Sequence, residues 1–109
     1  MNDNEYLNML YHFDHAFDQG KKLLLDWENG LKVRCLSDTG MYETDTEPGN
    51  EDYIGEYAVA VGDVEILEQG RDRSVLIFNN SIEISLKNIP TKIATEDGTL
   101  LWQRSANEA

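Results

Sequence analysis

Residues 21–36, KKLLLDWENGLKVRCL, decide the fold of this chain. Their pattern predicts two strands joined by a tight turn, and the strand register determines which side chains are buried. A two-residue turn at Asn29-Gly30 would pair Trp27 with Lys32 and Leu25 with Arg34, which mixes apolar and charged residues on one face. A three-residue turn makes one face wholly apolar, with the pairs Trp27–Leu31, Leu25–Val33 and Leu23–Cys35. Because a buried face specifies register strongly, we predict the three-residue turn, whose last position suits the positive φ of Gly30.

The segment before this hairpin, Asp3–Gln19, is predicted to be an α-helix. Its apolar side chains recur every three or four residues and form one stripe, made of Tyr6, Met9, Leu10, Phe13 and Phe17. Asn2 is a suitable N-terminal cap, and Gly20 is a suitable stop signal. We expect the helix to pack on the sheet through this stripe.

The chain after the first hairpin alternates short apolar segments with turn signals. It predicts strands over residues 41–45, 53–61 and 64–68, with Gly62-Asp63 as an interruption. A second hairpin is predicted over residues 74–86. Its Asn79-Asn80 turn would pair Ile77 with Ile82 and Val75 with Ile84. A third hairpin is predicted over residues 92–103, across Asp97-Gly98.

The strands are short and no helix alternates with them, which predicts an antiparallel meander. The expected fold class is α+β, mainly β. An N-terminal helix would pack on a small antiparallel β-barrel or a strongly curved sheet of about seven short strands. We expect one globular domain over residues 1–103, with helix over 3–19 and antiparallel β-structure over 21–103. Residues 104–109 have no apolar pattern and are expected to form a frayed tail.

Composition limits the classes of function. Of 109 residues, 40% are hydrophobic, which is enough for a core. Nine basic and 21 acidic residues give a net charge of -12, with a pI of about 4.3. This charge opposes binding to nucleic acid or to an anionic membrane through phosphates. It favours a basic protein partner, or solubility alone.

The cysteine content and the N-terminus bear on the compartment. Cys35 is the only cysteine, so no intrachain disulfide forms, and the hairpin register places it inside as an inert thiol. The N-terminal sequence lacks the basic and apolar regions of a signal peptide, and no apolar run is long enough to span a membrane. We therefore expect a cytoplasmic protein without a membrane partner.

Charge segregation is the sharpest functional signal. No Lys or Arg occurs between Cys35 and Gln69, and this span holds ten acidic residues: Asp38, Glu43, Asp45, Glu47, Glu51, Asp52, Glu56, Asp63, Glu65 and Glu68. It is either a solvated acidic surface or a docking surface for a basic protein, whose association it would steer. Tyrosine is a preferred interface residue. The candidate partner-binding residues are therefore Tyr42, Glu43, Asp45, Glu47, Glu51, Asp52, Tyr53 and Glu56.

Other polar groups do not match known catalytic or metal sites. The carboxylates of residues 43–52 are numerous enough for Ca²⁺, but their spacing differs from an EF-hand and Pro48 interrupts them. His12 and His15 have a spacing found in zinc sites, but no third His and no nearby Cys accompanies them. The sequence contains no GxSxG, no Gly-rich phosphate loop and no CxxC. We therefore expect a non-catalytic protein with no cofactor and no metal.

In composition, the chain resembles bacterial immunity and antitoxin proteins, which are small, acidic and single-domain. The resemblance implies an inhibitor of a basic protein and assigns no residue roles. Our leading interpretation is a non-catalytic interaction domain that presents residues 41–56 to a basic protein. The alternative is a small-molecule-binding β-barrel with a pocket near Trp27 and Trp102. The oligomeric state is left open.

Overall fold

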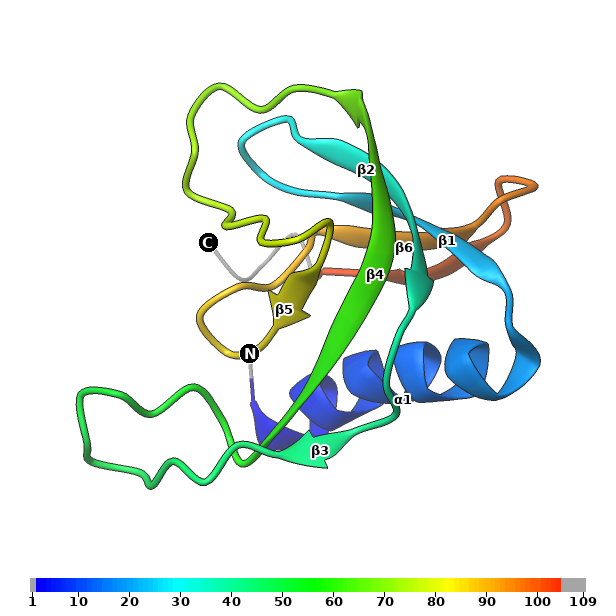
Figure 1. The fold of residues 1–109 in the computed structure, drawn as a ribbon. Helices are drawn as coiled ribbons and strands as arrows, with labels where there is room; N and C mark the ends of the chain where they lie inside the picture. Colours follow the sequence, from blue (N-terminus) through cyan, green and yellow to red (C-terminus); the bar gives the residue numbers. More distant parts are fainter. Residues whose placement is uncertain (1, 105–109) are drawn as a thin grey trace.

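A computed structural model describes residues 2–104 of the protein. One helix packs on a curled antiparallel sheet that forms a half-barrel, and the helix closes its lower end in Figure 1. This confirms the expected fold class. The elements are α1 (Asp3–Gln19), β1 (Lys22–Asp26), β2 (Lys32–Ser37), β3 (Tyr42–Glu43), β4 (Tyr57–Glu68), β5 (Ile82–Ile84), β6 (Lys92–Thr95) and β7 (Leu100–Gln103).

Helix α1 has the predicted bounds and caps. The side chain of Asn2 accepts a hydrogen bond from the backbone N–H of Glu5 at 2.9 Å, and Gly20 ends the helix with φ 64°. The buried face contains Tyr6, Met9, Leu10, Phe13 and Ala16. The prediction that Phe17 belongs to this face is wrong, because its side chain is 45% exposed. In the last turn, the small side chain of Ala16 occupies the buried side instead.

The first hairpin has the predicted register. Leu23 pairs with Cys35, and Leu25 pairs with Val33. The Trp27 N–H donates to the carbonyl oxygen of Leu31 at 2.9 Å, which closes the three-residue turn. Gly30 has φ 94°, the positive value that the turn requires.

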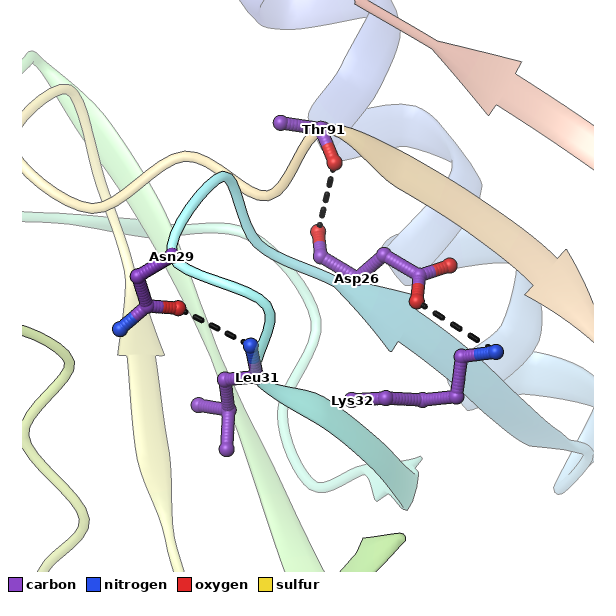
Figure 2. Close-up of polar contacts among 5 residues, drawn as sticks. All are labelled: Asp26, Asn29, Leu31, Lys32 and Thr91. Carbon is purple, nitrogen blue, oxygen red and sulfur yellow. Dashed lines mark hydrogen bonds and ion pairs between the residues drawn. The ribbon is translucent and has the colours of Figure 1, made fainter. Parts of the chain in front are cut away.

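Side-chain contacts stabilise this turn and the strand ends beside it (Figure 2). The Asn29 side-chain oxygen accepts the backbone N–H of Leu31 at 3.0 Å. Lys32 forms an ion pair with Asp26 at 3.7 Å on the outer face. The Thr91 hydroxyl donates to the carbonyl oxygen of Asp26 at 3.1 Å, which joins the end of β1 to the start of β6.

The sheet order is β3-β4-β2-β1-β6-β7, and β5 also pairs with β4. The expected strands 53–61 and 64–68 are one strand of 12 residues that begins at Tyr57. The predicted interruption is a β-bulge inside β4, where the register with β2 shifts and Asp63 has φ 51°. The expected strand over residues 41–45 is limited to Tyr42–Glu43.

The second hairpin differs most from the prediction. Its turn is correct, because Asn79 and Asn80 both have positive φ and two 2.9 Å hydrogen bonds join Phe78 with Ser81. The predicted pairs of Ile77 with Ile82 and of Val75 with Ile84 are wrong. Ile82 and Ile84 pair with Val61 and Val59 of β4. The chain before the turn leaves the sheet, because the Arg71 N–H donates to the carbonyl oxygen of Asn29 at 2.8 Å and ties it to the first hairpin.

The third hairpin repeats the geometry of the first. The Thr95 N–H donates to the Thr99 carbonyl oxygen at 2.9 Å, and Gly98 at the end of the three-residue turn has φ 92°. After β7, the Arg104 N–H donates to the Thr91 carbonyl oxygen at 2.8 Å. The other residues of the expected frayed tail lie outside the described part of the chain.

The core lies between α1 and the concave side of the sheet. Its largest fully buried side chains are Phe13, Met9, Leu10, Leu23, Leu25, Ile82, Ile84, Ile93, Val33, Val59 and Val61. Cys35 is 1% exposed, and burial raises the pKa of its thiol to about 12, so the thiol stays protonated at neutral pH. Within residues 2–104, no helix has the length and apolar character needed to cross a membrane.

Candidate functional site

The acidic segment, residues 41–56, includes β3 and the connection from β3 to β4 (Figure 1). Every carboxylate in it belongs to an exposed residue; these residues are Glu43, Asp45, Glu47, Glu51, Asp52 and Glu56. The segment therefore presents its charge to solvent. The two candidate tyrosines, Tyr42 and Tyr53, are half-buried.

Hydrogen bonds close the base of the acidic segment. The hydroxyls of Thr44 and Thr46 both donate to the carbonyl oxygen of Gly55, that of Thr46 at 3.2 Å. The Ile54 N–H donates to the Thr46 hydroxyl oxygen at 3.2 Å, and the Thr44 N–H donates to the carbonyl oxygen of Glu56 at 3.0 Å. These bonds join the two ends of the segment, so the tip projects from a fixed base.

The tip is shaped by two successive backbone turns. The Asn50 N–H donates to the Glu47 carbonyl oxygen at 3.2 Å, and the Tyr53 N–H donates to the Asn50 carbonyl oxygen at 3.1 Å. Gly49 has φ 93°, and no atom lies within 4 Å of the position that a Cβ would occupy there. The Lys87 ammonium donates to the carbonyl oxygen of Glu51 at 2.7 Å, and this bond leaves the Glu51 carboxylate available.

Distant elements hold the segment in place, and sequence reasoning missed them. The Asp14 carboxylate of α1 accepts the Met41 N–H at 2.9 Å. A Cβ at Gly40 would lie 2.7 Å from this carboxylate oxygen, so a larger residue there would displace the Asp14 side chain. The Leu86 N–H donates to the Ile54 carbonyl oxygen at 2.9 Å. No local pattern marks Asp14 as a partner of residue 41, because 27 positions separate them.

Tyr42 and Tyr53 connect the acidic segment to the rest of the surface. The Tyr42 hydroxyl donates to the Glu83 carboxylate of β5 at 2.5 Å, and burial together with this carboxylate raises the pKa of Tyr42. Tyr53 lines a hollow of about 170 Å³ together with Tyr6 and Tyr57. Both side chains keep part of their surface accessible, as a contact residue requires.

Within the described residues, no carboxylate of the acidic segment forms an ion pair. Ion pairs in residues 2–104 join Lys32 with Asp26, and Arg34 with Glu65 and Glu96. None of these pairs involves a carboxylate of the acidic segment. The six carboxylates therefore repel one another across a fixed loop, and this repulsion would be relieved by an approaching cationic surface.

The geometry of the described residues bears on two other kinds of site, a metal site and a small-molecule pocket. In the described part of the chain, no three side chains of His, Cys, Asp or Glu converge as metal ligands would. Trp27 is buried, and its indole N–H donates to the Asn88 side-chain oxygen at 2.9 Å. It borders an open hollow of about 460 Å³ whose lining is mostly polar or charged. Trp102 is not part of this lining and pairs with Ile93, so the two tryptophans do not form one pocket.

Comparison with known proteins identifies a similar family. A protein-family model described as "Cognate immunity protein YxxD" matches residues 1–106. The chain contains the sequence Tyr-x-x-Asp twice, at residues 11–14 and 42–45. The aspartate of the first accepts the N–H of the residue that precedes the second. No curated protein and no solved structure matches the chain.

Proposed function

Because the chain belongs to the family of cognate immunity proteins YxxD, we propose that it is a non-catalytic inhibitor of a basic partner protein in the bacterial cytoplasm. Its cognate partner would be a toxin, which the immunity protein neutralises by binding. We further propose that the acidic segment is the surface that this partner meets. The observation that carries this proposal is a set of six exposed carboxylates on a hydrogen-bonded base, none of which forms an ion pair with a residue between 2 and 104.

The mechanism would be steered association. The net charge of -12 produces a field of one sign, and the acidic segment concentrates part of it on one loop. Such a field speeds the encounter with a cationic protein and selects among partners more than it sets affinity. Because the base is closed by hydrogen bonds, the segment would lose little conformational entropy on binding. Tyr42 and Tyr53 would then make the first close contacts.

The first experiment identifies the partner. The full chain, immobilised through its C-terminus, is incubated with lysate of its native host, and captured proteins are identified by mass spectrometry. We expect a basic protein in stoichiometric amount, with an activity that the chain abolishes when the two are mixed in purified form. Capture of no protein that the chain inhibits would contradict the proposed function.

The second experiment tests the acidic segment with that purified partner. Charge reversal of Glu43, Asp45 and Glu47 to Lys should slow association several-fold and flatten its dependence on salt. The fold should survive, because all three residues are exposed. Such substitutions change stability by within about 0.5 kcal/mol each at Glu43 and Glu47. The cost is larger at Asp45, because its φ is 57° and Lys adopts positive φ less readily than Asp does. The measurement is stopped-flow or surface-immobilised kinetics at several NaCl concentrations.

The matched control reverses three exposed carboxylates outside the acidic segment, Asp18, Glu28 and Glu68, which changes the net charge by the same amount. If both triple variants slow association equally, only the total charge matters. If the first variant keeps the wild-type on-rate and salt slope, the acidic segment is a solvated surface without a docking role.

A further inference from the structure

A run of apolar side chains is exposed before the second hairpin turn. This apolar segment, residues 75–78, has the sequence Val-Leu-Ile-Phe. Leu76 is 79% exposed, Phe78 is 77% exposed and Ile77 is 37% exposed. With Ile66 of β4, Leu76 and Ile77 line a hollow of about 330 Å³. Single exposed apolar residues are ordinary, but a contiguous group next to a hollow marks an interaction surface.

The apolar segment is fixed at both ends, so its exposure is a feature of the fold. At its start, the Asp72 carboxylate accepts hydrogen bonds from Asn29 at 2.9 Å and from the hydroxyl of Ser74 at 2.6 Å. At its end, the Val64 N–H of β4 donates to the carbonyl oxygen of Asn80 at 3.1 Å. Between these ties, the backbone of residues 75–77 makes no hydrogen bond with any other described residue. These backbone groups are available to a partner.

The apolar segment is linked to the acidic segment by a turn that contacts both. Leu86 lines the hollow of Tyr53 and Tyr57, and it also lines the hollow beside Trp27 to which Val75 contributes. The Leu86 N–H reaches the acidic segment at Ile54. In Figure 1, residues 44–56 and residues 69–78 extend toward the same side of the half-barrel, away from the hairpin of β6 and β7. The two segments adjoin opposite ends of β4, so a partner that meets both would extend along that strand.

We infer that the apolar segment anchors the same basic partner protein that the acidic segment attracts, with Leu76 and Phe78 entering an apolar depression on that protein. The inference rests on the proposed function. A second copy of this chain fits less well, because each copy carries a net charge of -12 and two acidic segments would approach each other. A cationic protein with an apolar depression is complementary to both segments.

The two segments would have different kinetic roles. Long-range attraction by carboxylates changes the on-rate, whereas burial of large apolar side chains changes the rate of dissociation. Interface energy is concentrated in a few well-buried side chains. Leu76 and Phe78 should therefore control how long the complex lasts, while the acidic segment controls how fast it forms.

The test uses the partner protein purified after the capture described above. Leu76→Ser and Phe78→Ser should each weaken binding by about 10-fold or more, and the double variant by about 100-fold or more, mainly through faster dissociation. On-rates and salt slopes should stay at wild-type values. The matched control is Leu100→Ser on β7, whose side chain is 50% exposed, and it should bind as wild type.

Thermal melting of each variant checks that the fold is intact. If the double variant dissociates from the captured partner at the wild-type rate, this inference is wrong and the proposed function stands. If sedimentation shows a wild-type dimer that the double variant breaks, the apolar segment binds a second copy and the inference is again wrong. If no protein that the chain inhibits is captured, the proposed function fails, and this inference fails with it.

Discussion

Gly30 shows how one residue fixes the register of the first hairpin. Its φ is 94°, a value that residues with a Cβ rarely adopt. Its N–H donates to the carbonyl oxygen of Trp27 at 3.0 Å. The space around it is not the constraint, because an added Cβ would make only an ordinary 3.7 Å contact with Arg71. The backbone conformation alone therefore selects glycine.

At this scale we expect Gly30→Val to be much more destabilising than Gly30→Asn. A strained φ costs about 1–3 kcal/mol, with β-branched residues at the upper end, whereas Asn tolerates positive φ better than other residues. Thermal melts of both variants measure the difference. Glu28→Val in the same turn is the control for a β-branched residue at negative φ, and it should change little. Equal melting temperatures for the Val and Asn variants at position 30 would show that the turn is assigned incorrectly.

At the scale of elements, α1 stabilises the sheet through one face and holds the acidic segment through another. Phe13 is fully buried against the sheet, whereas Phe17, one turn later, is 45% exposed. Asp14, on a different face, fixes the backbone of Met41. The helix therefore connects the core to the candidate binding surface, so a loss of its packing would also loosen the acidic segment.

The two phenylalanines of α1 give a matched test of this packing. Phe13→Ala should cost about 3–5 kcal/mol, as deletion of a buried Phe side chain usually does. Phe17→Ala removes the same atoms from the same helix and should cost about 1 kcal/mol or less, because much of the side chain already contacts water. Urea unfolding measures both values. A loss below about 1 kcal/mol for Phe13→Ala would mean that α1 does not pack on the core.

At the scale of the whole molecule, net charge opposes the compact state. The charge of -12 is spread over an exposed surface on which ion pairs involve only a few carboxylates of the described residues. Exposed ion pairs contribute little to stability, so they do not offset the repulsion. The protein therefore keeps its acidity at a cost in stability, as a binding role for the acidic segment would require.

We expect the urea midpoint of the wild-type chain to rise between roughly 20 and 300 mM NaCl, because salt at these concentrations screens charges beyond a distance on the order of 10 Å. The variant with Glu43, Asp45 and Glu47 reversed to Lys has half the net charge. Its midpoint should rise less over the same range of salt, because fewer like charges remain to be screened. The same ionic strength of choline chloride separates screening from specific sodium binding. A wild-type midpoint that does not change with either salt would show that repulsion is unimportant.

The sequence by itself determined the local features: the bounds of α1, the register of the first hairpin, the Asn79-Asn80 turn and the segregation of acidic residues. These follow from hydrophobic periods of 3.6 and 2 residues and from the φ values that turns demand, all of which are encoded within a few positions. The helical period also placed Phe17 on the buried face, which is wrong, because the period does not show how far along the helix the sheet extends.

Only the tertiary structure decided which strand edge each segment joins. β5 pairs with β4. Arg71 and Asp72 hydrogen-bond to Glu28 and Asn29 of the first hairpin turn, so the chain that follows them, residues 75–77, does not pair with β5. Likewise, Gly55 closes the acidic segment, and Asp14 fixes its start. Such pairings join residues far apart in the chain, and competition among all available edges and donors decides them, which no local pattern records.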